Sequence, residues 1–312
     1  MEYITLKNSD LVVSRLCMGG CPLGGYGWGE TQENELIDAV HTALDRGITF
    51  FDTADTYGLG QSELTLGKAL GNHRKDVVIA SKFGVRVGGG KTVYDNSPAY
   101  IKEALDASLK RLGTDYIDLY QVHYRDGVTP IEEVVGALEE AKKAGKIRYY
   151  GLSNIHEEDK KELSHHLGKF VSFQDEYSLA CRKNETDMLS IAEELQMTPL
   201  TWGSLGQGIL TGKYTKENVN FGSNDRRSRE IYVNFHGDKF LKNLDIVEAM
   251  RPIAEKYNKP VSAVAIRYIL DYLPGSVVLV GAKRPAQILG NVEGCDWKLD
   301  ESDLQKLEEV SR

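Results

Sequence analysis

The sequence predicts a single (β/α)8 barrel, the TIM-barrel fold, that spans residues 1–312 as one domain. Short apolar runs alternate with longer amphipathic runs about eight times along the chain, and strict alternation implies a parallel sheet with right-handed crossovers. No internal repeat, linker or shift in composition marks a domain boundary. A doubly wound open sheet would give the same alternation, but eight consecutive units favour the closed barrel.

Each predicted strand is a short apolar run, and each predicted helix carries apolar residues at helical spacing. In the first helix, Leu36, Val40 and Leu44 show that spacing. Ser62 is expected to cap the second helix. Strands are predicted at 12–18, 48–51, 77–81, 116–122, 147–152, 170–173, 198–201 and 277–280. Helices are predicted at 33–46, 62–70, 97–111, 130–144, 157–167, 185–195, 241–257, 262–271, 285–291 and from 301 onward.

The alternation breaks over residues 203–240, which form a long polar stretch with several glycines and no clear period. Loops of this length in compact domains are usually functional or mobile. The stretch contains the cationic run 225–229, whose sequence is Asp-Arg-Arg-Ser-Arg. We therefore expect this stretch to be either functional or mobile.

Charge and cysteine content exclude several partners and sites. The net charge of -8 repels phosphate backbones and anionic lipid, so neither nucleic acid nor a membrane is expected as a partner. No apolar run approaches the roughly 18 residues of a membrane helix, and the first residues lack the features of a signal peptide. The four cysteines have no zinc-binding spacing, so we expect no metal and a reduced, cytoplasmic location.

Polar side chains follow the predicted strands where each strand ends, which is the edge at which barrels of this kind assemble their active sites. Tyr57 lies five positions beyond Asp52, the residue at the end of the second strand. The other strand ends carry Lys82, His123, Ser153, Asn154, Gln174, Trp202, Lys283 and Arg284. Packing alone does not explain ionisable or amide groups at nearly every strand end.

Four of these side chains suit proton transfer to a carbonyl oxygen. Tyrosine has a pKa of about 10, so it is a weak acid that still donates a proton at neutral pH. Lys82 is expected to lower the pKa of Tyr57 by stabilising the phenolate, and Asp52 is expected to pair with Lys82. His123 would either orient a substrate oxygen or share in proton donation. The alternative for Asp52, Lys82 and His123 is a buried structural ion network.

The order of these residues resembles the aldo-keto reductase family along nearly the whole chain. Residues 47–58, with the sequence GITFFDTADTYG, resemble the second-strand signature of that family. The segment 205–213 resembles the family's cofactor loop, and 281–287 resembles the segment that closes over the adenosine phosphate. The bacterial branch that includes general stress protein reductases is the most similar. Further blocks match in the same order, at 81–82, 119–123 and 151–154.

The resemblance implies that the chain reduces an aldehyde, ketone or sugar-like carbonyl with NADPH, without a Rossmann domain or a metal. No G-x-G-x-x-G occurs in the sequence. Lys283 and Arg284 would bind the 2′-phosphate, which favours NADP over NAD. The arginines of 225–229 would either face solvent or fold over the cofactor phosphates. The residues implied to contact the cofactor are Gly19, Gly20, Asp52, Ser153, Asn154, Gln174, Trp202, Gly203, Ser204, Leu205, Gly208, Lys213, Gly281, Ala282, Lys283, Arg284, Gln287 and Asn291.

Within this set, the resemblance also assigns individual contacts. Ser153, Asn154 and Gln174 would bind the nicotinamide carboxamide. Trp202 would stack on the nicotinamide ring, and Tyr57 would protonate the carbonyl oxygen. Gln287 and Asn291 would contact the adenine end of the cofactor.

The substrate pocket is expected to be lined by residues of the loops at the barrel mouth, and aromatic rings with few polar groups suit a small or sugar-like carbonyl compound. Cys21 stands where related sequences often have a bulky aromatic residue, which would widen the pocket floor. Asp175 and Glu176 stand where relatives often have prolines, and would either add negative charge near the cofactor or face solvent. The predicted pocket residues are Cys21, Tyr26, Trp28, Phe83, Tyr124 and Arg125.

Two other functions remain open at the level of sequence. One is an NADPH-binding redox-sensing or regulatory subunit with slow turnover. The other is a barrel enzyme that uses redox chemistry transiently, such as an epimerase. The intact set of Asp52, Tyr57, Lys82 and His123 favours the reductase, which we expect to act on a small-molecule carbonyl as a monomer or small homo-oligomer.

Overall fold

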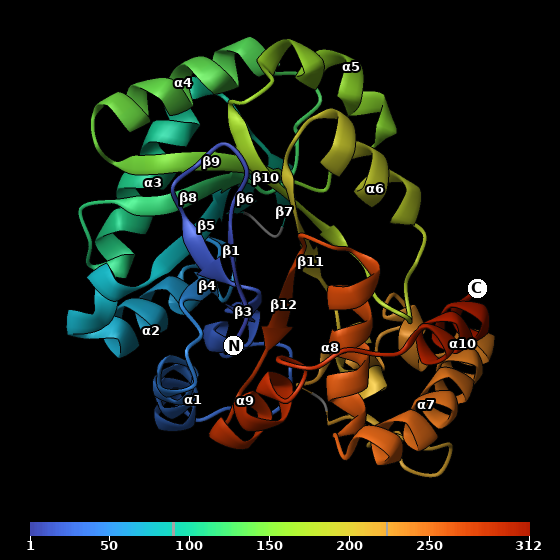
Figure 1. Cartoon of the computed structure of the whole chain (residues 1–312). Helices are drawn as coiled ribbons and strands as arrows, with labels where there is room; N and C mark the ends of the chain where they lie inside the picture. The colour runs from blue at the N-terminus through green and yellow to red at the C-terminus, as the bar shows by residue number, and fades with distance from the viewer. Residues whose placement is uncertain (89–90, 223) are drawn as a thin grey trace.

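The predicted barrel is present in the computed structural model, which describes residues 1–88, 91–222 and 224–312. Eight parallel strands close in the order β10-β11-β12-β3-β4-β5-β8-β9 (Figure 1). The fold prediction is therefore confirmed. The barrel strands are β3 (Leu16–Gly19), β4 (Phe50–Asp52), β5 (Val78–Phe83), β8 (Ile117–Val122), β9 (Ile147–Ser153), β10 (Phe170–Glu176), β11 (Thr198–Trp202) and β12 (Val277–Gly281).

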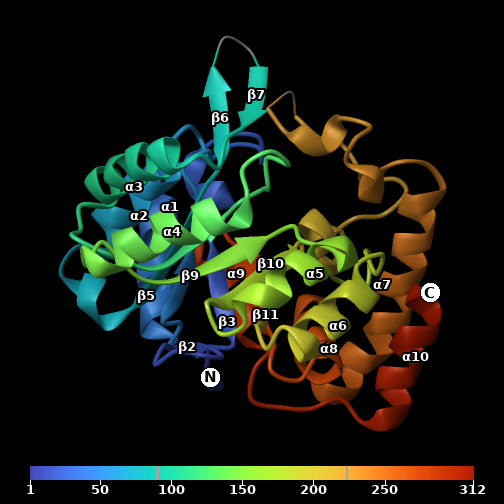
Figure 2. The ribbon, with the colours of Figure 1, turned by 90° about the horizontal axis from the view of Figure 1, so that it is seen from above.

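Helices surround the barrel (Figures 1 and 2). Ser62 does not cap α2 as predicted, because Gly60 holds the N-cap position at φ 94°. The Ser62 hydroxyl instead points inward and donates to the Gly20 carbonyl at 2.7 Å. The helices are α1 (Glu33–Asp45), α2 (Gln61–Leu70), α3 (Pro98–Leu112), α4 (Ile131–Lys143), α5 (Lys160–Leu163), α6 (Glu185–Glu194), α7 (Gly237–Tyr257), α8 (Val261–Tyr272), α9 (Pro285–Val292) and α10 (Glu301–Ser311).

The strand predicted over 12–18 is broken at Arg15 into two strands with different partners. Its first part, β2 (Val12–Ser14), pairs antiparallel with β1 (Tyr3–Thr5). Leu6 and Leu11 between these strands are buried against the apolar interior of the barrel. The backbone of Ser14 is hydrogen-bonded to Thr49, just before β4 begins. The hairpin therefore closes the N-terminal end of the barrel (Figure 1).

A second unpredicted hairpin follows β5 at the opposite end of the barrel. It consists of β6 (Val85–Gly88) and β7 (Lys91–Tyr94), which pair antiparallel and project away from the barrel (Figure 2). Nearly all of its side chains are exposed, including Val87 and Val93. Because neither strand has a buried face, the sequence lacks the apolar alternation by which strands are predicted.

The interior of the barrel changes from apolar to polar along its axis. Away from the C-terminal strand ends, the interior is a packed apolar cluster that includes Cys17, Phe50, Leu119, Leu200 and Leu279. The inward side chains near the C-terminal strand ends are polar, and a charge buried there needs partners that compensate for lost hydration. These buried polar residues are Asp52, Lys82, Gln121 and Gln174.

Two segments depart from regular helices. The helix predicted over 157–167 is instead α5 flanked by 3-10 turns at Glu157–Asp159 and Ser164–His166. The described residues of the stretch 203–240 form three 3-10 turns, and α7 begins within it at Gly237, four residues before the predicted start. The turns of this stretch are Gly206–Thr211, Arg226–Ser228 and Val233–Phe235.

Candidate functional site

Lys82 holds together the groups predicted to transfer a proton. Its side chain is fully buried, and its ammonium lies 2.6 Å from Asp52 Oδ1. The same nitrogen donates to the Thr53 carbonyl at 3.1 Å and to the Tyr57 hydroxyl at 3.3 Å. An ammonium has three hydrogens to donate, and each has an acceptor here. All three acceptors lie on β4 or on the loop that follows it, so one strand end fixes the arrangement.

The second carboxylate oxygen of Asp52 is held by two amides from other strands. Gln121 Nε2 donates to Asp52 Oδ2 at 3.2 Å, and Gln174 Nε2 donates to it at 2.9 Å. Gln121 is not among the residues predicted from the sequence. The signal was available, because Gln121 is two residues before His123, and alternate residues of a strand share a face. The two amides leave Asp52 little freedom to turn away from Lys82.

His123 follows β8 and lies beside the Tyr57 ring. The two rings meet edge to face with centroids 5.8 Å apart, and His123 stacks on Tyr124 at 5.0 Å. Burial, followed by the charge of Lys82, lowers the pKa of His123 well below its ordinary value. The imidazole is therefore neutral at physiological pH, which favours the predicted orienting role over proton donation by an imidazolium.

The predicted lowering of the Tyr57 pKa is wrong for this structure. Burial and then the negative charge of Asp52 raise the pKa of Tyr57 well above its ordinary value. The reason is that Lys82 is paired with Asp52, so the phenol does not experience an isolated positive charge. Tyr57 therefore keeps its proton through the neutral pH range, which suits a proton donor.

The three residues predicted to bind a carboxamide lie together beside Asp52. Ser153 Oγ donates to the Gln174 carbonyl at 2.9 Å. Asn154 Nδ2 donates to the His123 carbonyl and to Ser153 Oγ, each at 3.0 Å. Asn154 has a φ of 55°, a left-handed conformation that asparagine tolerates better than most residues. Trp202 lies at the end of β11, partly buried against the apolar interior of the barrel.

Cations gather where the long 203–236 stretch meets the end of β12. Desolvation and then the charge of Arg227 lower the pKa of both Lys213 and Lys283. Lys283 Nζ also donates to the Trp28 carbonyl at 2.6 Å, and Arg284 pairs with Glu35 on α1 at 3.2 Å. This cluster can accept an anion such as a phosphate.

The remaining predicted cofactor residues lie on the same strand ends and loops. A Cβ on Gly20 would lie 2.8 Å from the Asp52 carbonyl oxygen, so β3 can approach β4 only with glycine there. Ser204 Oγ donates to the Thr201 carbonyl, and Gln287 Oε1 accepts from the Lys283 backbone. Asn291 Nδ2 is buried with no hydrogen-bond partner among the described residues. The others are Gly19 on β3, Gly203, Leu205 and Gly208 after β11, and Gly281 and Ala282 at the end of β12.

The predicted substrate pocket is only partly assembled. Trp28 Nε1 donates to Cys21 Sγ at 3.2 Å, and Tyr124 stacks on His123. Phe83 was predicted wrongly, because it is fully buried and stacks on Tyr120 in the layer between barrel and helices. Lys82 points into the barrel, so the next side chain along the strand points outward.

Two other predicted positions have partners within the protein. The guanidinium of Arg125 pairs with Glu162 at 3.1 Å, and its place in the substrate pocket stays a prediction. Asp175 does not face solvent. It is buried on the outer side of β10, where Asn184 Nδ2 donates to it at 2.8 Å. Glu176 accepts from Gln207 Nε2 at 3.2 Å.

Ionisation of Asp55 is expected to make the free energy of unfolding depend on pH. Burial and then the charge of Glu63 raise the pKa of Asp55 to about 7, against the opposing charges of Arg111 and Lys82. Its Oδ1 atom is buried without a hydrogen-bond partner among the described residues. Because the folded-state pKa lies above the unfolded value, the folded state loses stability as pH rises from about 4 to 7.

Asp55→Asn is therefore expected to raise the free energy of unfolding by about 1–2 kcal/mol at pH 8, with a smaller gain at pH 5. Urea unfolding of both proteins at the two pH values measures this difference. A gain that stays the same at both pH values would show that ionisation of Asp55 is not its cause.

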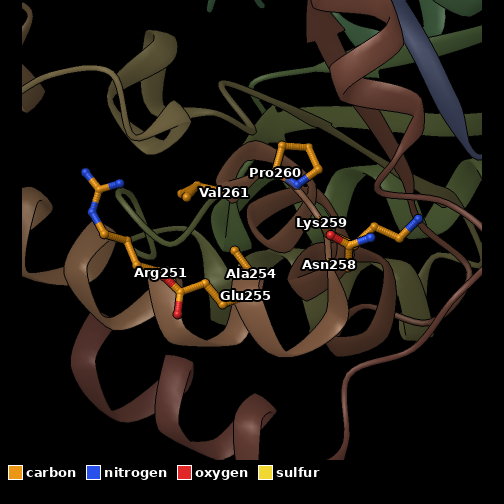
Figure 3. Close-up of a pocket in the computed structure, with 7 residues that line it drawn as sticks. All are labelled: Arg251, Ala254, Glu255, Asn258, Lys259, Pro260 and Val261. Carbon is orange, nitrogen blue, oxygen red and sulfur yellow. The ribbon is translucent and has the colours of Figure 1, made fainter.

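A surface cavity lies away from these strand ends, between the end of α7 and the start of α8. It measures about 440 Å³ and is open to solvent (Figure 3). Its lining consists of Arg251, Ala254, Glu255, Asn258, Lys259, Pro260 and Val261, none of which belongs to the predicted site. In the described part of the chain, no three metal-ligating side chains lie close enough to hold an ion. No helix there is long and apolar enough to cross a membrane.

Relatives of known sequence cover nearly all of this chain. It is 36% identical to the aldo-keto reductase YhdN of Bacillus subtilis, an alignment that covers 99% of this chain and 93% of that protein. It is 32% identical to the NADH-specific methylglyoxal reductase of Escherichia coli, with coverage of 100% and 98%. Both alignments include every strand of the barrel.

Solved structures agree with the sequence relatives. The glycerol dehydrogenase AKR11B4 from Gluconobacter oxydans superposes with a TM-score of 0.89 at 32% identity, covering 99% of this chain and 94% of that one. The aldo-keto reductase AKR11C1 from Bacillus halodurans gives a TM-score of 0.81 at 30% identity, with coverage of 100% and 97%. The sequence model of the Aldo/keto reductase family matches residues 15–312. This chain therefore belongs to the aldo/keto reductase family, and it is an oxidoreductase that reduces carbonyl compounds.

Proposed function

We propose that this chain is an NADPH-dependent carbonyl reductase in which Tyr57 protonates the carbonyl oxygen. The observation that carries the proposal is the contact between the Lys82 ammonium and the Tyr57 hydroxyl, with Asp52 on the other side of the ammonium. A bound nicotinamide supplies the hydride to the carbonyl carbon, which leaves the protein to bind and orient the substrate and to deliver one proton.

The side chains divide this work between them. The neutral His123 ring lies beside the phenol and orients the carbonyl oxygen by a hydrogen bond. Tyr57, which holds its proton at neutral pH, transfers that proton to the oxygen as negative charge develops there. Lys82 stabilises the phenolate that forms, and Asp52 keeps the ammonium charged and in place.

The residues present are suited to holding a dinucleotide. Ser153, Asn154 and Gln174 supply amide and hydroxyl groups for a carboxamide. Lys213, Arg227, Lys283 and Arg284 supply positive charge for phosphates. The buried Nδ2 of Asn291 has no hydrogen-bond partner among the residues that the structure describes, and an adenine ring nitrogen would satisfy this donor.

The preference for NADP over NAD rests on Lys283 and Arg284, and the NADH-specific relative makes this preference worth testing. The double variant Lys283→Gln, Arg284→Gln is expected to weaken NADPH binding about 10- to 100-fold, because charge-assisted bonds to the 2′-phosphate are lost. NADH binding should change less than about threefold, because NADH lacks that phosphate. Fluorescence titration with both nucleotides measures the two dissociation constants, and equal losses for both would contradict the assignment.

Stopped-flow mixing of NADPH-loaded protein with aldehydes and ketones tests the proposed reaction. We expect single-turnover oxidation of the bound NADPH and formation of the corresponding alcohol. If no carbonyl compound oxidises the nucleotide, the redox-sensing alternative is supported. If product forms while NADPH is retained at the end of the reaction, transient redox chemistry is supported.

A further inference from the structure

Arg226 lies across the loop that carries two of the predicted pocket aromatics. Its backbone N–H donates to the Gly27 carbonyl at 3.0 Å, and its side chain runs along the Gly27 backbone. The guanidinium carbon is 4.9 Å from the Tyr26 ring centroid and 5.8 Å from that of Trp28. A Cβ on Gly27 would lie 1.9 Å from Arg226 Nε, so this contact exists only because residue 27 is glycine.

The same guanidinium is linked to the thiol of Cys21 through Trp28, whose Nε1 donates to Cys21 Sγ at 3.2 Å. Burial raises the pKa of the Cys21 thiol, while the Trp28 N–H and then the positive charges of Arg226 and Lys82 act in the opposite direction. Cys21 in turn is one of the groups near enough to affect the Tyr57 phenol. Arg226 and Cys21 therefore both contact the Trp28 side chain, in the loop that carries predicted pocket residues.

Most hydrogen-bond donors of the Arg226 guanidinium have no partner among the described residues. Among the described residues it forms no ion pair, its Nε is buried without a partner, and its one side-chain hydrogen bond runs from Nη2 to the Tyr26 carbonyl at 3.3 Å. Asp225 next to it is not available, because Arg227 Nε holds that carboxylate at 2.7 Å. The free donors of Arg226 can therefore form charge-assisted hydrogen bonds to an anionic group of a ligand.

The position of Arg226 favours a contact with the substrate over a contact with the cofactor. The neighbouring Arg227 lies with Lys213 and Lys283, where phosphates of the cofactor would be bound. Arg226 lies instead over Tyr26 and Trp28, beside Cys21. We infer, on the basis of the proposed function, that the carbonyl substrate carries a carboxylate or phosphate group and that Arg226 binds this group while the carbonyl lies at Tyr57.

Matched pairs of aldehydes test this inference. Succinic semialdehyde differs from butyraldehyde by a carboxylate, and glyceraldehyde 3-phosphate differs from glyceraldehyde by a phosphate. The wild-type protein is expected to show a higher kcat/KM for the anionic member of at least one pair, and which pair shows it identifies the anion. In Arg226→Gln the ratio of kcat/KM within that pair should fall about 10- to 100-fold, as expected for the loss of a charge-assisted hydrogen bond.

Arg229→Gln is the matched control, because Arg229 is an exposed residue of the same turn region. In the described part of the chain, its guanidinium hydrogen-bonds only to the Tyr26 hydroxyl, at 3.4 Å. This variant removes the same charge and should leave the ratio within about twofold. Arg226→Lys keeps the charge and should retain part of the preference. If Arg226→Gln does not fold or does not bind NADPH, the wild-type protein is assayed at several salt concentrations instead. The ratio of kcat/KM for the anionic aldehyde to that for the neutral one should then fall as ionic strength rises.

Several results would overturn the inference. Equal kcat/KM for both members of both pairs in the wild type, or an unchanged ratio in Arg226→Gln, would show that Arg226 does not bind a substrate anion. A loss of NADPH affinity in Arg226→Gln with an unchanged ratio would assign the residue to the cofactor instead. Failure to reduce any aldehyde would contradict the proposed function itself, which distinguishes the two failures.

Discussion

Tyr57→Phe is expected to lower kcat for carbonyl reduction about 1000-fold and to leave the dissociation constant of NADPH within about twofold, because loss of a general acid typically costs 100- to 10,000-fold. The variant removes one oxygen atom, the atom that lies 3.3 Å from Lys82 Nζ, and keeps the ring that packs against His123. Steady-state kinetics with a reactive aldehyde and fluorescence titration of NADPH measure the two quantities.

Tyr124→Phe is the matched control for this variant. It removes a phenol from the neighbouring residue, whose ring stacks on His123 at 5.0 Å. Because no contact joins this hydroxyl to Lys82 in the described structure, kcat should change less than about fivefold. A kcat in Tyr57→Phe that matches the wild type, or a loss of equal size in Tyr124→Phe, would show that Tyr57 is not the proton donor.

Lys82→Met is expected to lower stability and activity together. Lys82 is fully buried and lies 2.6 Å from Asp52, so its loss leaves an unpaired carboxylate inside the barrel. Breaking a buried ion pair in this way costs about 3–5 kcal/mol in the free energy of unfolding. Activity should fall about 1000-fold, because the phenolate of Tyr57 loses the charge that stabilises it. Urea unfolding and steady-state kinetics measure the two losses.

The double variant Asp52→Asn, Lys82→Met separates the two effects. It also removes the carboxylate charge of Asp52, which is unpaired in Lys82→Met. The free energy of unfolding should therefore recover most of its loss, while activity should remain as low as in Lys82→Met. If the double variant regained activity, Lys82 would have a structural role only. If Lys82→Met alone remained fully stable, the buried pair would not hold the strand ends as the structure implies.

The barrel could be predicted from sequence because its strands are buried and its helices are amphipathic. The paired strands β6 and β7 could not be predicted in this way, because neither has a buried face. The alternation of side chains along a strand also accounts for one site residue that was not predicted and for one residue that was predicted wrongly. Gln121 shares the inward face with His123, and Phe83 follows an inward lysine and so points outward.

Properties that depend on three-dimensional proximity were not predictable from sequence. Tyr57 was expected to have a lowered pKa, but burial and the Asp52 charge raise it. The contact of Arg226 with Gly27 joins residues about 200 positions apart, and no local pattern indicates it. The partners of Lys283 and Arg284, which are the Trp28 carbonyl and Glu35, also come from a distant loop and helix.

A crystal structure of the wild-type protein with NADP+ tests most directly whether phenol, ammonium, carboxylate and imidazole act together on a carbonyl group. The account predicts that the Tyr57 hydroxyl remains within hydrogen-bond distance of Lys82 Nζ, with the nicotinamide ring next to it and the 2′-phosphate at Lys283 and Arg284. A bound dinucleotide whose nicotinamide lies away from Tyr57, or a Tyr57 hydroxyl separated from Lys82 in the complex, would contradict it.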